Sequence, residues 1–199
     1  GLGNHLGLIT STLTNADFPQ DVLAIVGDHL LALNHVHVST AFNRLGKVAT
    51  RRDFSPLLLT DDDGFQALLR LATKFAEKGR FDARHVATTT HGIAKLHAAR
   101  RLDTTDARVD GALKALECDV VRVATAMNSQ NVANTMYAYA ALGRMPGDKT
   151  CAALDIAAAR VAQDMKPQEV ANTVWAYATL GRAPGNYTWS SLETAAGRV

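Results

Sequence analysis

Two consecutive stretches of the sequence repeat at a spacing of 38 residues. Between residues 129–161 and 167–199, 19 of 33 positions are identical. The strings QxVANT and AYAxLGRxPG occur in both stretches. A repeat of this length is typical of stacked helical hairpins, because a single hairpin cannot bury its apolar face without a neighbour. The repeat therefore constrains the fold more than any other feature of the chain.

Each repeat divides into two expected helices. In the second helix of the last repeat, Val170 and Val174 lie on one face of an α-helix, together with further apolar or small residues at the same spacing. Pro167 suits the first position of this helix, and Gly181 suits the position just after its end. The first helix of the preceding repeat is expected over residues 150–161.

Weaker copies of the same unit are visible upstream. A valine marks each second helix, at spacings of 48, 46 and 38 residues: Val38, Val86, Val132 and Val170. A residue suited to an N-cap precedes three of these valines by four positions: Asn34, Asp82 and Asn128. The predicted hairpins cover residues 21–50, 64–98, 106–143 and 148–181, followed by a partial helix over 186–199. We expect one helical-repeat domain over residues 1–199, as a fragment of a longer array.

The composition agrees with a folded helical protein. The chain is 47% hydrophobic and 20% charged, and it contains only five prolines. We expect an all-α fold, a right-handed α-solenoid of stacked helical hairpins with about 38–48 residues per repeat. No apolar run approaches the roughly 20 residues that a membrane-spanning helix needs. The formal charge of +2 is compatible with a polyanionic partner but does not demand one.

Motifs for catalysis and metal binding are missing from the sequence. The two cysteines lack the spacing of a zinc site, and the seven histidines do not converge with acidic or thiol partners. No phosphate-binding loop, nucleophile elbow or zinc-protease motif occurs. We therefore expect no enzyme activity, no metal and no cofactor.

The strings at residues 167–181 and 129–143 resemble the motif of the octotricopeptide repeat family. The similarity is strong over residues 116–199. The earlier units depart from the motif at Thr40, Asn43, Thr88 and His91. They resemble the degenerate repeats of proteins that carry a RAP domain, which this stretch lacks. The resemblance implies an RNA-binding protein of the mitochondrion or chloroplast. Such proteins act in transcript stabilisation, processing or translation, or bind rRNA as ribosome components.

Candidate RNA contacts lie at the start of the second helices. Asn and Gln side chains offer a donor and an acceptor together, which suits the edge of an unstacked base. The candidates are Gln130, Asn131, Asn134, Gln168, Glu169 and Asn172. Asn131 and Glu169 differ between the repeats, as expected of positions that contact different bases. Asn134 and Asn172 are identical, which also fits a structural role through hydrogen bonds to the backbone of an adjacent repeat.

Basic residues recur just after the second helices. They are Lys47, Arg51, Arg52, Lys95, Arg100, Arg101, Arg144 and Arg182. Stacked in register, these cations would form a stripe that follows a phosphate backbone. Alternatively, they complement the negative ends of the helix dipoles in solvated turns. A second basic row recurs inside the first helices at Arg122, Arg160 and Arg198.

The aromatic residues of the two clear repeats fall into two pairs. Tyr139 and Tyr177 lie on the apolar helix face, so we expect them in the core. Tyr137 and Trp175 lie two positions earlier, and we expect them to pack between repeats. The sequence thus favours a protein that binds single-stranded RNA or rRNA within an organellar ribonucleoprotein. The alternative is a protein-interaction scaffold without direct RNA contact.

Overall fold

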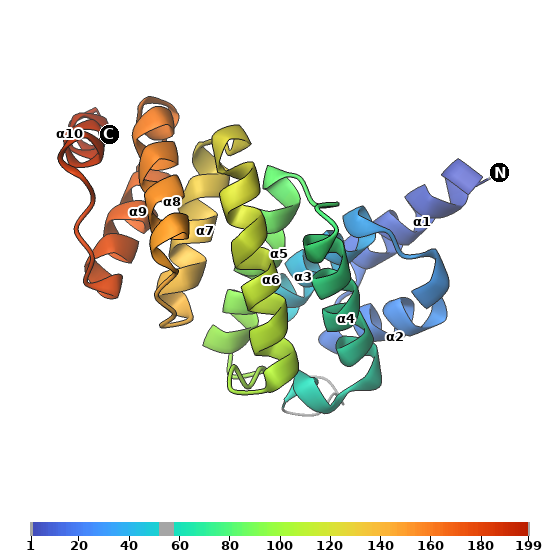
Figure 1. Ribbon diagram of the computed structural model, residues 1–199. Coiled ribbons are helices and arrows are strands. Elements are labelled where there is room, and N and C mark those ends of the chain that lie inside the picture. The colour runs from blue at the N-terminus through green and yellow to red at the C-terminus, as the bar shows by residue number, and fades with distance from the viewer. Residues whose placement is uncertain (1, 52–57, 199) are drawn as a thin grey trace.

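The computed structural model describes residues 2–51 and 58–198. Within those ranges the chain forms ten α-helices, four short 3₁₀ turns and no strand (Figure 1). The helices are α1 (Leu2–Asn15), α2 (Pro19–Asp28), α3 (His35–Val48), α4 (Asp63–Glu77), α5 (Ala83–Ala98), α6 (Ala107–Val123), α7 (Ser129–Ala141), α8 (Asp148–Val161), α9 (Pro167–Leu180) and α10 (Asn186–Ala196). The 3₁₀ turns are η1 (Leu30–Ala32), η2 (Leu59–Asp61), η3 (Ala124–Ala126) and η4 (Ala162–Asp164). The expected all-α fold is confirmed.

The helices lie in two rows, and each helix packs against the next but one along the chain (Figure 1). The odd-numbered helices α1 to α9 form one row, called the B row here. The even-numbered helices α2 to α10 form the other, called the A row. Consecutive helices such as α7 and α8 also contact each other across the two rows. This packing is consistent with stacked hairpins.

The valine spacing located the B row correctly. The four expected second helices are α3, α5, α7 and α9, and their marker valines are all at most 5% exposed. No prediction covered α1, which precedes α3 in the B row. Among residues 3–15 of α1, the buried hydrophobic side chains are those of Ile9 and Leu13. The apolar residues Leu6, Ile9 and Leu13 of α1 do follow helical spacing, but its glycines and its run of Ser and Thr lower the helix propensity of this segment.

The three expected N-caps are confirmed. The Asn34, Asp82 and Asn128 side chains each accept a hydrogen bond from the backbone N–H three residues later. The fourth B helix begins at Pro167 instead. The first N–H of a helix has no partner within the helix, so the N–H that proline lacks costs no hydrogen bond. Its end is also as predicted, because Gly181 adopts the left-handed conformation with a φ of 65°.

The early B helices pack closely through a glycine. A Cβ atom at Gly92 of α5 would collide with the backbone carbonyl oxygen of Phe42 in α3. At Gly46 of α3, a Cβ would lie 3.1 Å from Lys95 Cβ and 3.2 Å from Gly92 Cα. The absence of side chains at these two positions therefore brings the two backbones together and leaves a hollow above the contact.

Arginines of the A row link neighbouring repeats by hydrogen bonds to backbone carbonyls. Arg160 Nη2 donates to the backbone carbonyls of Ala124 (3.1 Å) and Met127 (2.7 Å), at and after the turn η3. Arg198 donates in the same way to Ala162 and Gln163 in η4. These carbonyls follow the C-termini of A helices, where the backbone lacks intrahelical donors. The second basic row thus serves stacking.

Acidic residues make the reciprocal link to the next A helix. Glu117 Oε1 accepts a hydrogen bond of 2.7 Å from the backbone N–H of Gly147, the N-cap of α8. Asp155 accepts one of 3.2 Å from Gly185, the N-cap of α10. A carboxylate at a helix N-terminus is favoured by the unpaired N–H groups and the helix dipole. The helix α8 is therefore tied both to α6 before it and to α10 after it.

Candidate functional site

Asn131 and Glu169, which we expected to vary between repeats with the RNA base that they contact, help to cap their helices. Asn131 is 7% exposed, and its Oδ1 accepts from the backbone N–H of Asn128 at 3.3 Å. Glu169 Oε2 accepts from the backbone N–H of Lys166 at 2.9 Å. Histidines occupy the same helix position in α3 and α5 and cap it in the same way. The position varies because several side chains can accept this hydrogen bond.

The remaining amides lie on the outer face of the B row. Gln130 and Gln168 are exposed, whereas Asn134 and Asn172 are half-buried. Gln168 Nε2 donates to Asn172 Oδ1 at 2.9 Å, so this pair shares a face as the spacing predicted. Within the described ranges, neither asparagine hydrogen-bonds to the backbone of an adjacent helix. No contact therefore supports the alternative role of these asparagines, in which they hydrogen-bond to the backbone of an adjacent repeat.

The basic turns are largely tied to acidic residues of the protein. Arg144 forms an ion pair of 2.8 Å with Asp110 in α6, and Arg182 forms one of 3.3 Å with Asp148 in α8. Arg51 pairs with Asp17 at 3.1 Å. These ion pairs make the turns poor candidates for a stripe of free cations.

The other expected members of the stripe have separate environments. Arg101 is only 9% exposed. Arg100 is exposed and adopts a left-handed conformation with a φ of 58°, which is the conformation of Gly143 and Gly181 at the other helix ends. Arg52 lies outside the described residues. The stripe of cations along the turns stays a prediction, and in this structure several of its members pair with aspartates instead of standing free.

Aromatic rings of successive B helices form a ladder that the sequence analysis did not identify. His91, Tyr137 and Trp175 each lie five residues after the marker valine of their helix. The ring centroids are 5.5 Å apart for His91 and Tyr137, and 5.3 Å apart for Tyr137 and Trp175. Tyr137 and Trp175 thus pack between repeats as expected, while Tyr139 and Tyr177 are buried in the core as expected.

The aromatic ladder (His91, Tyr137 and Trp175) combines an apolar surface with nearby positive charge. Trp175 is 45% exposed, and the other two rings are half-buried. Lys95 Nζ lies 6.0 Å from the centroid of the Tyr137 ring, within reach of a cation–π interaction. Burial and the adjacent Lys95 lower the pKa of His91 to about 4. The imidazole is therefore neutral near pH 7 and behaves as an uncharged aromatic ring.

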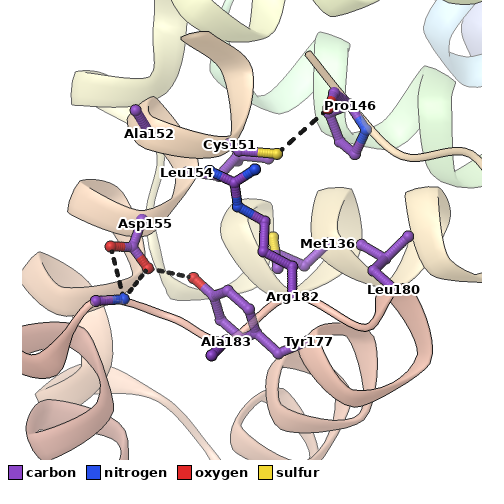
Figure 2. A pocket seen from close by; sticks show the side chains of 11 residues that line it. Met136, Pro146, Cys151, Ala152, Leu154, Asp155, Tyr177, Leu180, Arg182 and Ala183 are labelled. Atoms are coloured by element: carbon purple, nitrogen blue, oxygen red, sulfur yellow. Dashed lines mark hydrogen bonds between the residues drawn. The ribbon is translucent and has the colours of Figure 1, made fainter. Parts of the chain in front are cut away.

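A partly open pocket of about 280 Å³ lies between α7, α8 and α9 (Figure 2). The Tyr177 hydroxyl donates to Asp155 at 2.8 Å, and the Cys151 thiol donates to the Pro146 carbonyl at 3.4 Å. Burial raises the pKa of the Cys151 thiol, which keeps it protonated and weakly nucleophilic. The Tyr177 hydroxyl thus links α9 to α8 within one hairpin, and the Cys151 thiol binds the turn that precedes its own helix.

The described part of the chain offers no grouping of three His, Cys, Asp or Glu side chains that could hold a metal ion. Among its helices, none is long and apolar enough to cross a membrane. No family model matches the chain, and no curated protein matches it. The similarity to the octotricopeptide repeat family stays a prediction.

Proposed function

We propose that this protein is a right-handed α-solenoid of the octotricopeptide repeat type that binds single-stranded RNA along its B row. The next-but-one packing of the helices and the 38-residue repeat support the solenoid. Equivalent side chains recur at regular intervals in such a fold, so a chemical feature repeated in each unit becomes a continuous track.

The aromatic ladder carries this proposal. Unpaired bases stack on aromatic side chains, with about 1–3 kcal/mol per base lost on alanine substitution, whereas bases inside a duplex hide their faces. Trp175 and Tyr137 present ring surface on neighbouring repeats, and Lys95 brings a cation beside Tyr137. Single-stranded RNA matches this combination of stacking surface and positive charge.

The outer amides give the ladder a means of base selection. Asn172 lies three residues before Trp175, and Asn134 lies three residues before Tyr137, so each amide is next to its ring on the helix surface. Gln168 and Gln130 extend the same face by one further turn. A base stacked on a ring would present its edge to these donors and acceptors. Asn131 and Glu169 take no part, since they cap helices.

The octotricopeptide repeat resemblance extends the proposal to the cell. We place the protein in the mitochondrion or chloroplast, where it acts on a transcript or binds rRNA as part of a ribonucleoprotein. Fractionation of cells that express the full-length protein tests the location. Recovery of the protein in the cytosol alone would contradict it.

A protein-interaction scaffold is the second candidate. The observation in its favour is exposed apolar surface near the C-terminal end of the A row. Ile156 of α8 is 70% exposed and Tyr187 of α10 is 79% exposed, and both line one groove. Exposed apolar groups gathered in this way are typical of protein contacts.

Titration of the protein with single-stranded RNA, followed by fluorescence anisotropy, tests the RNA proposal. We expect salt-dependent binding and weaker binding of a duplex of the same sequence. Trp175→Ala should weaken RNA binding about tenfold, as loss of one stacked base predicts. Trp189→Ala is the matched control, since Trp189 is also 45% exposed but lies in α10, outside the ladder. Equal effects of the two substitutions would contradict the proposal.

A further inference from the structure

An open groove of about 590 Å³ lies where α3 and α5 approach each other on the outer face of the B row. Gly46 and Gly92 contribute to its floor, because the close contact of the two helices excludes side chains there. Ala49, Ala98 and Ala99 add further small side chains to the lining. The groove is within the size range of pockets that bind small molecules.

Two lysines line this groove from opposite helices, Lys47 from α3 and Lys95 from α5. Both are exposed, and over residues 2–51 and 58–198 neither forms an ion pair. The arginines of the later turns contrast with them, since Arg144 and Arg182 are paired with aspartates. Two unpaired cations on one groove create a local positive potential that a bound anion would relieve.

The groove continues the aromatic ladder. His91 and Tyr137, the first two rings of the ladder, also line the groove. The next equivalent position in the B row is Asn43, which lines the groove too. At this end of the ladder, the Asn43 amide therefore occupies the position of an aromatic ring. The groove lies where that ring would otherwise offer a stacking surface to a base.

We propose that the α3–α5 groove is a nucleotide-binding subsite that holds one phosphate of the RNA strand between Lys47 and Lys95 and one base over the glycine floor. This inference rests on the proposed function, since it assigns an anchoring point to the same strand. The Asn43 amide faces the base edge, and the uncharged His91 ring flanks the base. The subsite binds the strand at one end of the ladder and so fixes its position along the B row.

The double variant Lys47→Gln/Lys95→Gln tests the phosphate contact. With a fluorescein-labelled single-stranded oligoribonucleotide, we expect about tenfold weaker binding at 0.1 M salt, and a slope of log affinity against log salt that is smaller by about 1. The control is Lys74→Gln/Lys149→Gln, which makes the same charge change at two exposed lysines of the A row. This control should change the affinity by less than about twofold.

A filling variant tests the base contact separately. Ala98 is exposed at the end of α5 and lines the groove, so Ala98→Leu narrows the groove without entering the core. We expect severalfold weaker RNA binding with an unchanged salt slope, because the lysines remain. The probe adenosine 5′-monophosphate should shift the backbone amide signals of Gly46 and Gly92 in an NMR titration, and adenosine should shift them less.

The outcomes separate the two proposals. If Trp175→Ala weakens RNA binding while the lysine pair behaves as its control, the groove is not a subsite, and RNA binding through the ladder stands without a role for Lys95. If the wild-type protein binds no single-stranded RNA at any salt concentration, the proposed function fails and the subsite with it. Circular dichroism melting should be the same for both lysine variants, which excludes unfolding as the cause of weaker binding.

Discussion

The early part of the stack, α2 to α5, and the later part, α6 to α9, build the same two-row packing from different side chains. The outer face of the early B helices carries Lys47 and Lys95, whereas Ala141 and Thr179 occupy the equivalent positions later. The later part carries Tyr137 and Trp175 with their amides. The two lysines thus lie at the early end of the aromatic ladder, with Lys95 beside Tyr137, while the buried marker valines stay the same.

The two parts also differ in which groups accept hydrogen bonds from the arginines of the A row. Turns η3 and η4 offer backbone carbonyls to Arg160 and Arg198. The α4–α5 connection contains no 3₁₀ turn, and Arg122 donates there to the Phe81 carbonyl and to Asp119 in its own helix. Asp119 is 3% exposed and replaces the small residues Ala157 and Ala195 of the later repeats. The Asp119 carboxylate thus accepts a hydrogen bond that the carbonyls of a 3₁₀ turn accept in the later repeats.

The largest expected effect comes from removing the contacts of Arg122 at the α4–α5 connection. Arg122→Met should lower the free energy of unfolding by about 3 kcal/mol, because it leaves the buried Asp119 carboxylate without its partner. Arg160→Met should cost about 2 kcal/mol, the loss of two charged hydrogen bonds to carbonyls. Urea unfolding measures both. Adding Asp119→Ala to Arg122→Met should restore about 1 kcal/mol, and a further loss would refute this account.

The second prediction uses the histidine of the ladder. The pKa of His91 is about 4 in the folded protein, whereas a solvent-exposed histidine has a pKa of 6.5, so the unfolded chain binds more protons between these values. Stability should therefore fall as the pH drops below 6.5, by up to about 2.5 kcal/mol at about pH 4.5. Thermal unfolding across this range measures the effect. His91→Phe should flatten the dependence, and an unchanged profile would contradict the assignment.

The third prediction compares two tyrosines at identical repeat positions. The Tyr177 hydroxyl donates to Asp155, whereas the buried Tyr139 hydroxyl has no hydrogen-bond partner in the described structure. Tyr177→Phe should therefore cost about 1.5 kcal/mol, and Tyr139→Phe should be neutral or stabilising. Denaturant midpoints of the two variants give the comparison. Equal losses would show that both hydroxyls are satisfied in solution.

The smallest expected effects concern the helix caps. Glu169→Ala and His85→Ala each remove a side-chain acceptor for the N-cap N–H, in a late and an early repeat. Each should cost about 0.5–1 kcal/mol, with the shorter hydrogen bond of Glu169 giving the larger loss. Thermal melting measures the loss. RNA affinity should not change with Glu169→Ala, and a large decrease would return Glu169 to the RNA-binding set.

Much of the helix pattern could be predicted from local sequence signals. The valine spacing, the three polar N-caps and Gly181 located α3, α5, α7 and α9, because capping and apolar periodicity act within a few residues. The first helix α1 was missed, since its glycines and its run of Ser and Thr lower helix propensity, although Leu6, Ile9 and Leu13 follow helical spacing. The caps at Asn131 and Glu169 had a sequence signal as well: each lies three residues after an N-cap position.

The candidate site was less accessible to sequence reasoning. The roles of Arg144 and Arg182 depend on Asp110 and Asp148, which lie 34 residues earlier in the chain. The ladder had a signal, because His91, Tyr137 and Trp175 share one repeat position, but the ring distances follow from how α5, α7 and α9 stack. The groove likewise depends on the contact between Gly46 and Gly92.

The sequence by itself determined which segments are helical and which faces are buried, since both depend on neighbours within one or two helical turns. The tertiary structure decided which polar side chains are used inside the protein and which remain for a partner. That choice depends on hydrogen bonds and ion pairs between residues 30 or more positions apart, which form only after the hairpins stack. The unpaired lysines and the exposed rings are what this internal pairing leaves available.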